Sequence, residues 1–425
     1  MTSSRQPDSK QIKVLIDARI EPGRHGGVET VVANLANVFR CELNHDISPI
    51  WLVSPRSKKW VQSFIEKDWD IVVTDDEQSP QRIFLRVLNL LRRLKFLDPL
   101  VMVLRRLGIK KFSVPIIKLN YQELGIDLVH FVTQDVFQTS LPSIYQPHDL
   151  QHEHFPDFFS RREIDTRRRF YKLAMDQSTF TILSSNSAKN DFQAFYPEFG
   201  SKLGIVPQPA NFLGSKSERP SKNLSELFGE YYLYPAAVWP HKNHSNLLAG
   251  FSQFLEAYPD RKLILCGPRT DSDVVLSRII QDLSLENHVA LFGYVDSEQL
   301  KQLYHEAKAV IIPSLFEAGS FPIWEAFSFE KLVAVSNIQS LKSQAQDGAI
   351  FFDPNISQDI CRALEEIEDI FLNMQEHIYM QKSMQIYLKF SPCNTFLGFR
   401  YFYRRSLGMS IDASDEKWLK NGETF

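Results

Sequence analysis

The sequence predicts an α/β protein built from two doubly wound, Rossmann-like domains with a cleft between them. The chain has 425 residues, which is enough for two sizeable hydrophobic cores. Short apolar runs rich in β-branched residues alternate with stretches of helical periodicity, a pattern typical of parallel sheets covered by helices. Ligands of such folds bind at the carboxyl ends of the strands, so we expect the functional residues there.

Composition indicates a soluble globular protein. Hydrophobic residues make up 44% of the chain and charged residues 23%, both ordinary values. No apolar run approaches the roughly 18 residues of a membrane span, and residues 1–10 lack the apolar core of a signal peptide. The four cysteines form no C-x2-C pair, so we expect neither a zinc site nor a disulfide framework, and a reducing cytosol suits them. They are Cys41, Cys266, Cys361 and Cys393.

The chain opens with a strand, a glycine loop and a helix. Residues 12–18 are a buried strand by pattern, and an amphipathic helix is expected from about Thr30 to Phe39. This is the start of a dinucleotide-type βα unit, although the G-x-G-x-x-G motif is absent. Taken alone, the pair Gly26 and Gly27 between them is most simply a tight turn.

Residues 81–118 are unusually basic. Ten Lys or Arg side chains accompany a single acid, Asp98, with apolar residues at helical spacing between them. A basic amphipathic helix suits an anionic membrane surface, and we favour that reading for Arg82 to Lys118. The alternative is a solvated helix face on the flank of the domain. Nucleic acid is not expected as a partner, because aromatic residues are sparse here and no recognition motif appears.

Residues 146–156 contain three histidines, which raises the possibility of a metal-binding site. His148 and His152 are four residues apart, as two ligands on one helix face would be. Prolines bracket the segment, however, so we expect a loop, and no further ligand cluster accompanies it. We therefore expect no metal site.

Residues 308–327 carry the strongest functional signal. Ala309 to Ile312 is a short apolar strand, Gly319 lets the following loop turn, and Pro322 suits the first turn of a helix. A strand, tight loop and helix in this order leave backbone N–H groups at the helix start, where the helix dipole also attracts anions. The amides expected to form this anion seat belong to Gly319, Ser320 and Phe321.

Two carboxylates flank this loop, Glu317 before it and Glu325 in the expected first helical turn, with seven residues between them. Carboxylates accept hydrogen bonds well from sugar hydroxyls, so the pair could hold a nucleotide sugar at two points. The alternative is that Glu325 only complements the helix N-terminus while Glu317 is a solvated loop residue.

The segment from Glu317 to Glu325, E-A-G-S-F-P-I-W-E, resembles the E-x7-E signature of the retaining family 4 glycosyltransferases, which have the GT-B fold. The usual form is E-G-F-G-L-P-x-x-E-A, so Ala318, Ser320 and Phe321 are among the departures. The similarity extends over about residues 12–405. It implies transfer of a sugar from a GDP-mannose-like or UDP-sugar donor to a glycan or lipid-linked acceptor, with retention of configuration and without a metal or other cofactor.

The resemblance also implies roles for individual residues. Glu325 would hold the ribose and Glu317 the hydroxyls of the sugar. Lys242 would offset charge on the leaving diphosphate, and His148 would donate a hydrogen bond to a hydroxyl of the transferred sugar. The implied catalytic residues are thus His148, Lys242 and Glu317. The implied donor-binding residues are Gly26, Gly27, Lys242, Arg269, Tyr294, Val295, Gly319, Ser320, Phe321 and Glu325.

One departure concerns charge at the diphosphate. Ala236 stands where the family has an arginine, and His241 and Arg269 are the candidate substitutes. This departure keeps two alternatives open: a GT-B sugar-nucleotide epimerase or hydrolase, and a catalytically inactive nucleotide-sugar-binding or membrane scaffold protein.

We expect an acceptor-side domain over 11–212, a linker over 213–228, a nucleotide-sugar domain over 229–385, and a terminal helix over 386–408 that crosses back to the first domain. The expected location is cytoplasmic, with peripheral contact on the inner membrane face.

Overall fold

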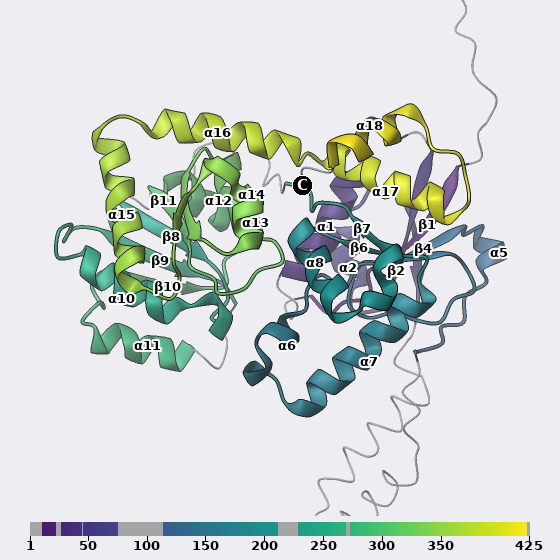
Figure 1. The fold of residues 1–425 in the computed structure, drawn as a ribbon, viewed down its shortest axis with the longest axis horizontal. Helices are drawn as coiled ribbons and strands as arrows, with labels where there is room; N and C mark the ends of the chain where they lie inside the picture. The colour runs from purple at the N-terminus through teal and green to yellow at the C-terminus, as the bar shows by residue number, and fades with distance from the viewer. Residues whose placement is uncertain are drawn as a thin grey trace, which may run out of the picture.

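The computed structural model describes residues 11–22, 27–44, 46–74, 114–210, 228–268 and 273–422. These residues form two parallel β-sheets flanked by helices, as the sequence predicts (Figure 1). The seven-stranded sheet of the N-terminal half has the order β3-β2-β1-β4-β5-β6-β7, and the six-stranded sheet of the C-terminal half has the order β10-β9-β8-β11-β12-β13. The linker expected over 213–228 lies outside the described residues except for Phe228.

The strands are short, and those at the centre of each sheet are almost wholly buried. In the N-terminal half they are β1 (Ile12–Asp17), β2 (Ile47–Val53), β3 (Asp70–Val73), β4 (Leu128–Phe131), β5 (Ser143–Tyr145), β6 (Phe180–Leu183) and β7 (Leu203–Ile205). In the C-terminal half they are β8 (Tyr231–Pro235), β9 (Lys262–Cys266), β10 (Val289–Gly293), β11 (Ala309–Ile312), β12 (Leu332–Ser336) and β13 (Ile350–Phe352).

Helices connect the strands and cover the sheets. In the N-terminal half they are α1 (Gly27–Phe39), α2 (Lys58–Gln62), α5 (Tyr121–Leu124), α6 (Gln151–His154), α7 (Arg161–Gln177) and α8 (Asn186–Phe195). In the C-terminal half they are α10 (His244–Phe254), α11 (Asp273–Asp282), α12 (Ser297–Glu306), α13 (Phe321–Ser328), α14 (Gln339–Ala345), α15 (Ser357–Leu372), α16 (Glu376–Lys389), α17 (Pro392–Ser406) and α18 (Ala413–Gly422). Short 3-10 helices add η3 (Pro156–Phe158), η4 (Pro197–Lys202), η5 (Pro240–Lys242) and η6 (Gln346–Gly348).

In both sheets the order in which strands are added switches from one side to the other at a central strand. In the N-terminal sheet β1 pairs with β2 on one side and β4 on the other, and in the C-terminal sheet β8 lies between β9 and β11. Loops that leave neighbouring strands on either side of such a point diverge, and this opens a crevice at the carboxyl ends of the strands. The loop that follows β11 therefore starts at the edge of the sheet where ligands of such folds bind.

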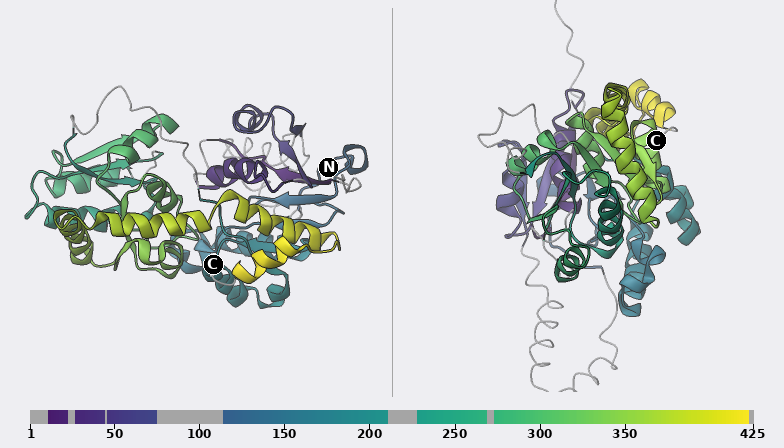
Figure 2. Two further views of the ribbon diagram at one scale, coloured as in Figure 1. Left: turned by 90° about the horizontal axis from the view of Figure 1, so that it is seen from above. Right: turned by 90° about the vertical axis from the view of Figure 1, so that its left-hand side faces the viewer.

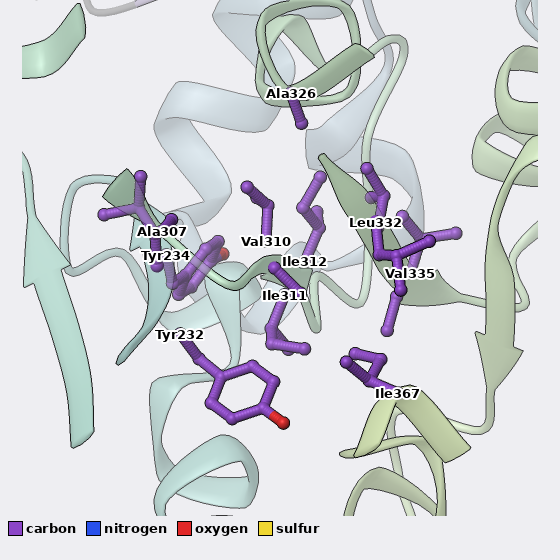
Figure 3. Close-up of a cluster of buried hydrophobic side chains, with 14 of the residues drawn as sticks. Tyr232, Tyr234, Ala307, Val310, Ile311, Ile312, Ala326, Leu332, Val335 and Ile367 are labelled. Atoms are coloured by element: carbon purple, nitrogen blue, oxygen red, sulfur yellow. The ribbon is translucent and has the colours of Figure 1, made fainter. Parts of the chain in front are cut away.

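Strand β11 is the rigid base of that loop. All four of its residues are buried, and β8 and β12 pair with it on its two sides. Val310, Ile311 and Ile312 pack among core side chains that include Tyr232 and Ile367 (Figure 3). A strand fixed by packing on both faces and pairing on both edges holds the following residues in place.

The C-terminal helices join the two halves. Helix α16 runs from the C-terminal half toward the N-terminal half, and α17 continues along the N-terminal half (Figure 2). Phe396, Phe399 and Phe402 of α17 pack into the core around β1. A Cβ at Gly204 of β7 would come within 2.2 Å of the Phe402 ring, so glycine is needed at this close approach.

The expectation that the cysteines form no disulfide is wrong for two of them. Cys41 and Cys393 form a disulfide bond with a Cα–Cα distance of 5.2 Å. Cys41 follows α1 and Cys393 lies in the first turn of α17, so the return of the chain brings together residues 352 apart in sequence. Nothing in the local spacing of the cysteines indicates this contact. Cys266 and Cys361 are free.

We expect Cys393→Ser to lower the free energy of unfolding by about 2–5 kcal/mol in protein kept oxidised, because the crosslink restricts the unfolded chain. Denaturant titration measures the change, and Cys361→Ser, which alters a free cysteine, is the matched control. Peptide mapping after thiol blocking should recover the crosslinked pair. Equal stability of the two variants would contradict a stabilising bond.

Candidate functional site

The loop after β11 brings Glu317 to Lys242. The Glu317 carboxylate accepts hydrogen bonds from Lys242 Nζ and from the Ser314 hydroxyl, the latter at 2.7 Å. The Glu317 side chain is 10% exposed and that of Lys242 is 21% exposed. Glu317 is therefore a largely buried, ion-paired group, and the solvated-loop alternative is wrong.

Lys242 is held in place through its backbone and its neighbour. Its carbonyl accepts a hydrogen bond from the Tyr234 hydroxyl (2.9 Å), which also lies 3.2 Å from the Ser314 hydroxyl. Asn243 adopts a left-handed conformation with φ 60°, which asparagine tolerates better than most residues. Its side-chain amide donates to the carbonyls of Pro313 (3.0 Å) and Pro354 (2.7 Å). Segments following β8, β11 and β13 are thereby tied together around the ion pair.

Glu325 lies one turn further into helix α13 than expected. The helix begins at Phe321 with Ser320 as its N-cap, so Glu325 is the fifth residue and belongs to the second turn. Its side chain is buried and accepts a hydrogen bond from the Tyr304 hydroxyl at 2.6 Å. Burial, together with the nearby carboxylate, raises the pKa of Tyr304 well above its usual value, so the phenol remains a donor. The two glutamates hence lie in different surroundings, one ion-paired and one bonded to a neutral phenol.

One of the three amides expected in the anion seat is already occupied. The Ser320 N–H donates to Gln344 Oε1 (2.8 Å), and Gln344 Nε2 donates back to the Ser320 carbonyl (2.6 Å). Helix α14 thus supports the start of α13 through one side chain. The expectation that the Ser320 amide awaits an anion is wrong in this conformation. Gly319 is exposed and Phe321 is half-buried.

His148 lies in the N-terminal half, after β5, with φ 74°. Its Nε2 is 2.9 Å from the Val132 carbonyl oxygen, which only accepts, so Nε2 carries the hydrogen. Burial lowers the pKa of His148, and the neutral ring therefore presents Nδ1 as an acceptor. The His148 ring in this form offers an acceptor at Nδ1, whereas the expected role toward the sugar was that of a donor, and the role itself stays a prediction.

The three histidines of residues 146–156 have separate surroundings. His154 Nε2 is 2.9 Å from Asp191 Oδ2, whereas His152 is buried with its ring 5.4 Å from that of Tyr171. The expected loop contains a short helix, α6, which carries His152 and His154 but not His148. Among the described residues, no group of three or more His, Cys, Asp or Glu is arranged to hold a metal ion.

A cavity of about 230 Å³ lies at the carboxyl ends of β8, β9 and β10. It is lined mostly by apolar and small residues, with Asp273 and Ser277 from α11 as its polar side chains. Tyr294, just beyond it, is 74% exposed, while Val295 packs against the core. The other lining residues are Ala236, Val238, Leu265, Cys266, Gly267, Val274, Leu276, Leu291 and Gly293.

Two residues, His241 and Arg269, are the candidate substitutes for the arginine that the family has at the position of Ala236. Burial and the neighbouring Lys242 lower the pKa of His241 to about 4, so this ring is neutral near pH 7 and does not replace an arginine. Arg269 and Gly26 lie outside the described residues, and Gly27 is the first residue of α1. Most of the basic segment from Arg82 to Lys118 also lies outside them, since the structure describes only 114–118 of it.

We expect acid to destabilise the protein through His241 and His244, whose pKa values burial lowers from 6.5 to about 4. Between pH 4 and 6.5 the unfolded chain then binds more protons than the folded one, so stability is complete above about pH 6.5 and falls toward pH 4. Denaturant midpoints at pH 7.5 and 5.0 measure the effect. His244→Phe should reduce the pH dependence, and an unchanged dependence would contradict this assignment.

Sequence reasoning missed three residues that organise the site. Ser314 fixes Glu317, Tyr304 bonds Glu325, and Gln344 binds the backbone of Ser320. Ser314 had a detectable signal, since a serine directly after a buried strand lies at the carboxyl edge of the sheet. Tyr304 and Gln344 had none, because they lie on the neighbouring helices α12 and α14.

Comparison with known proteins finds similarity to glycosyltransferases. Residues 215–379 match the family model for Glycosyl transferases group 1. The O-antigen chain mannosyltransferase RfbU of Salmonella typhimurium is 26% identical over 223 residues, which cover 52% of this chain and 60% of that protein. O-antigen chain mannosyltransferase B of Escherichia coli is 33% identical over 141 residues, 32% of this chain and 37% of that one. The chain thus matches less than two thirds of the length of either relative.

Solved structures share the architecture. Anabaena Alr3699/HepE in complex with UDP and glucose superposes with a TM-score of 0.66 at 18% identity, covering 93% of this chain and all of that chain. The sucrose-phosphate synthase tll1590 of Thermosynechococcus elongatus gives 0.65 at 14% identity, covering 94% of this chain and all of that one. Identities this low show the fold alone. With the match of residues 215–379 and the two parallel sheets, they show that the chain has the GT-B fold and that its C-terminal half is similar to the glycosyl transferases group 1 family.

Proposed function

We propose that the protein transfers a hexosyl group from a nucleoside diphosphate sugar to a glycan or lipid-linked acceptor. The observation that carries the proposal is the Lys242–Glu317 ion pair after β11, which lies in the half of the chain that matches the family. The two relatives above are named as O-antigen chain mannosyltransferases, which favours GDP-mannose as the donor. The family resemblance implies that the anomeric configuration is retained.

The ion pair suggests how the donor is engaged. Lys242 and Glu317 form an ion pair and neutralise each other. A diphosphate beside Lys242 competes for its ammonium group, and Glu317 is then free to accept hydrogen bonds from the sugar hydroxyls. Lys242 offsets the charge that develops on the leaving diphosphate, a form of electrostatic stabilisation that often dominates catalysis. From the N-terminal half, Nδ1 of His148 accepts from a hydroxyl of the transferred sugar or the acceptor.

We also propose an acceptor-side domain over 11–212 and a donor-side domain from 229. Phe390, just after α16, still packs in the C-terminal core, and α17 begins at Pro392. We therefore propose that the boundary before the terminal helix lies near residue 391 rather than 386. In the part of the chain that the structure describes, every helix is too short or too polar to cross a bilayer. Peripheral contact of Arg82 to Lys118 with the anionic inner face of a membrane remains a proposal.

A thermal-shift screen with GDP, UDP and ADP tests the proposal. The cognate nucleotide should stabilise the folded state by about 2.7 kcal/mol at a concentration 100 times its Kd. Mass spectrometry should then detect transfer from the corresponding sugar nucleotide to a lipid-linked or glycan acceptor. A protein stabilised by none of the three nucleotides would contradict the proposal.

A second candidate is a nucleotide-sugar-binding protein without transferase activity. Two observations favour it, the alanine at position 236 and the neutral His241, because both reduce the positive charge next to a diphosphate. The same screen separates the candidates. Stabilisation by a nucleotide without turnover across an acceptor panel supports the binding protein.

A further inference from the structure

The loop that carries Glu317 also forms a contact between the two halves. The ring of Phe316 lies 5.3 Å from that of His154 and 5.9 Å from that of Phe155, and both partners belong to the N-terminal half. The Ala318 carbonyl accepts a hydrogen bond from the Ser184 hydroxyl, just after β6, at 3.2 Å. Glu317, between these residues, binds Lys242 and Ser314 in the C-terminal half. Three consecutive residues thus contact the two halves in alternation.

The partners of Phe316 are anchored within the N-terminal half. His154 Nε2 lies 2.9 Å from Asp191 Oδ2 of α8, and its ring lies 5.9 Å from that of Phe195. Phe155 stacks on Phe158 with ring centroids 5.3 Å apart and an angle of 11°. Helices α6 and α8, which carry or adjoin these residues, lie on the side of the N-terminal half that faces the C-terminal half (Figure 1). Phe316 therefore packs against side chains that other contacts within the N-terminal half hold in place.

We propose that Phe316 is a positioning residue, which couples the approach of the two halves to the orientation of Glu317. Neighbouring Cα atoms are 3.8 Å apart and joined by a planar peptide, so a displacement of Phe316 is passed directly to Glu317. The Ala318–Ser184 hydrogen bond limits the loop on the other side. When the halves separate, the loop loses both contacts, and Glu317 keeps only its ion pair with Lys242 and its bond from Ser314. This inference rests on the proposed function for its kinetic consequence.

The kinetic test compares Phe316→Ala with Phe158→Ala. Phe158 stacks on the same Phe155 ring and is 41% exposed, so its removal perturbs the aromatic cluster without removing the contact to the loop. We expect Phe316→Ala to lower kcat by about 10- to 100-fold, as expected for misplaced reacting groups, while nucleoside diphosphate affinity stays within about twofold. Phe316→Tyr, which keeps the ring, should restore most of kcat, and Phe158→Ala should resemble the wild type. Wild-type kcat in Phe316→Ala would overturn the proposal.

A purely structural role predicts a different pattern. If Phe316 only stabilises the fold, Phe316→Ala lowers nucleotide affinity and kcat together through loss of folded protein. A double-mutant cycle separates the two roles further. Phe316→Ala and Phe155→Ala should be non-additive in kcat, because they remove the same contact. Additive effects on kcat would overturn the coupling.

Hydrogen exchange of residues 313–320 tests the inference without turnover. In the wild type and in Phe158→Ala this peptide should exchange at similar rates, whereas Phe316→Ala should exchange at least about tenfold faster through local opening. A protein inactive in every transfer assay but showing this pattern would refute the proposed function and leave the coupling intact. Equal exchange in Phe316→Ala and Phe158→Ala would refute the coupling, whatever the activity.

Discussion

Replacing Glu317 with glutamine is expected to lower the rate of sugar transfer by at least about 100-fold, with nucleoside diphosphate affinity equal to or above that of the wild type. Glutamine keeps the size of the side chain but removes the charge that holds Lys242. The lysine is then free to bind a diphosphate, while the sugar loses an anionic acceptor for its hydroxyls. Isothermal titration with the cognate nucleotide and a transfer assay with its sugar measure the two effects separately.

Ser314→Ala is the matched control for this prediction. It removes the second hydrogen-bond donor to Glu317 but leaves the carboxylate and its ion pair with Lys242. We expect a loss of transfer below about tenfold, since one neutral hydrogen bond contributes about 1 kcal/mol. If Glu317→Gln loses nucleotide affinity as strongly as it loses transfer, Glu317 serves the nucleotide rather than the sugar, and its assigned role is wrong.

The sequence predicts the fold well because its signals are local. Each strand from β8 to β13 leaves an apolar run, and Pro322 marks the start of α13. The strand β2 also has an apolar run over residues 50–53, but Pro49 stands inside the strand, and proline within a central strand is unusual. Pairing with β1 on one side and β3 on the other nevertheless incorporates it. The three residues of β5 are too few to show a pattern.

The candidate site is predictable only where one segment carries it. The sequence places Glu317, Gly319 and Glu325 on one loop and helix, since their spacing is local. It does not indicate that Glu317 is paired with Lys242, 75 residues away, or that Gln344 occupies the Ser320 amide. Such contacts depend on how neighbouring elements pack, and no periodicity in one segment encodes the partner in another. The error about the cysteines has the same cause, a contact formed only by the return of α17.

Replacing Glu325 with alanine should weaken binding of the nucleoside diphosphate by about 1–3 kcal/mol, or roughly 5- to 150-fold in Kd. The expected effect is the opposite of that of Glu317→Gln, because Glu325 is proposed to hold the ribose, which the nucleotide carries with or without the sugar. Its carboxylate is buried and bonded to Tyr304, so the acceptor is fixed before the ligand arrives. Calorimetry with the nucleotide alone measures the loss.

Two further variants separate ribose binding from support of the fold. Glu325→Gln keeps an oxygen that accepts a hydrogen bond from Tyr304 but removes the charge, so it should weaken nucleotide binding nearly as much as Glu325→Ala does. Tyr304→Phe keeps the carboxylate and removes only the hydroxyl that donates to it at 2.6 Å. This variant should therefore weaken nucleotide binding by less than about tenfold. If Tyr304→Phe weakens binding as much as Glu325→Ala, the Tyr304–Glu325 hydrogen bond acts by holding α12 against α13, and the ribose is bound elsewhere. If Glu325→Gln binds normally, the charge is dispensable, and a neutral acceptor at this position is enough for the ribose.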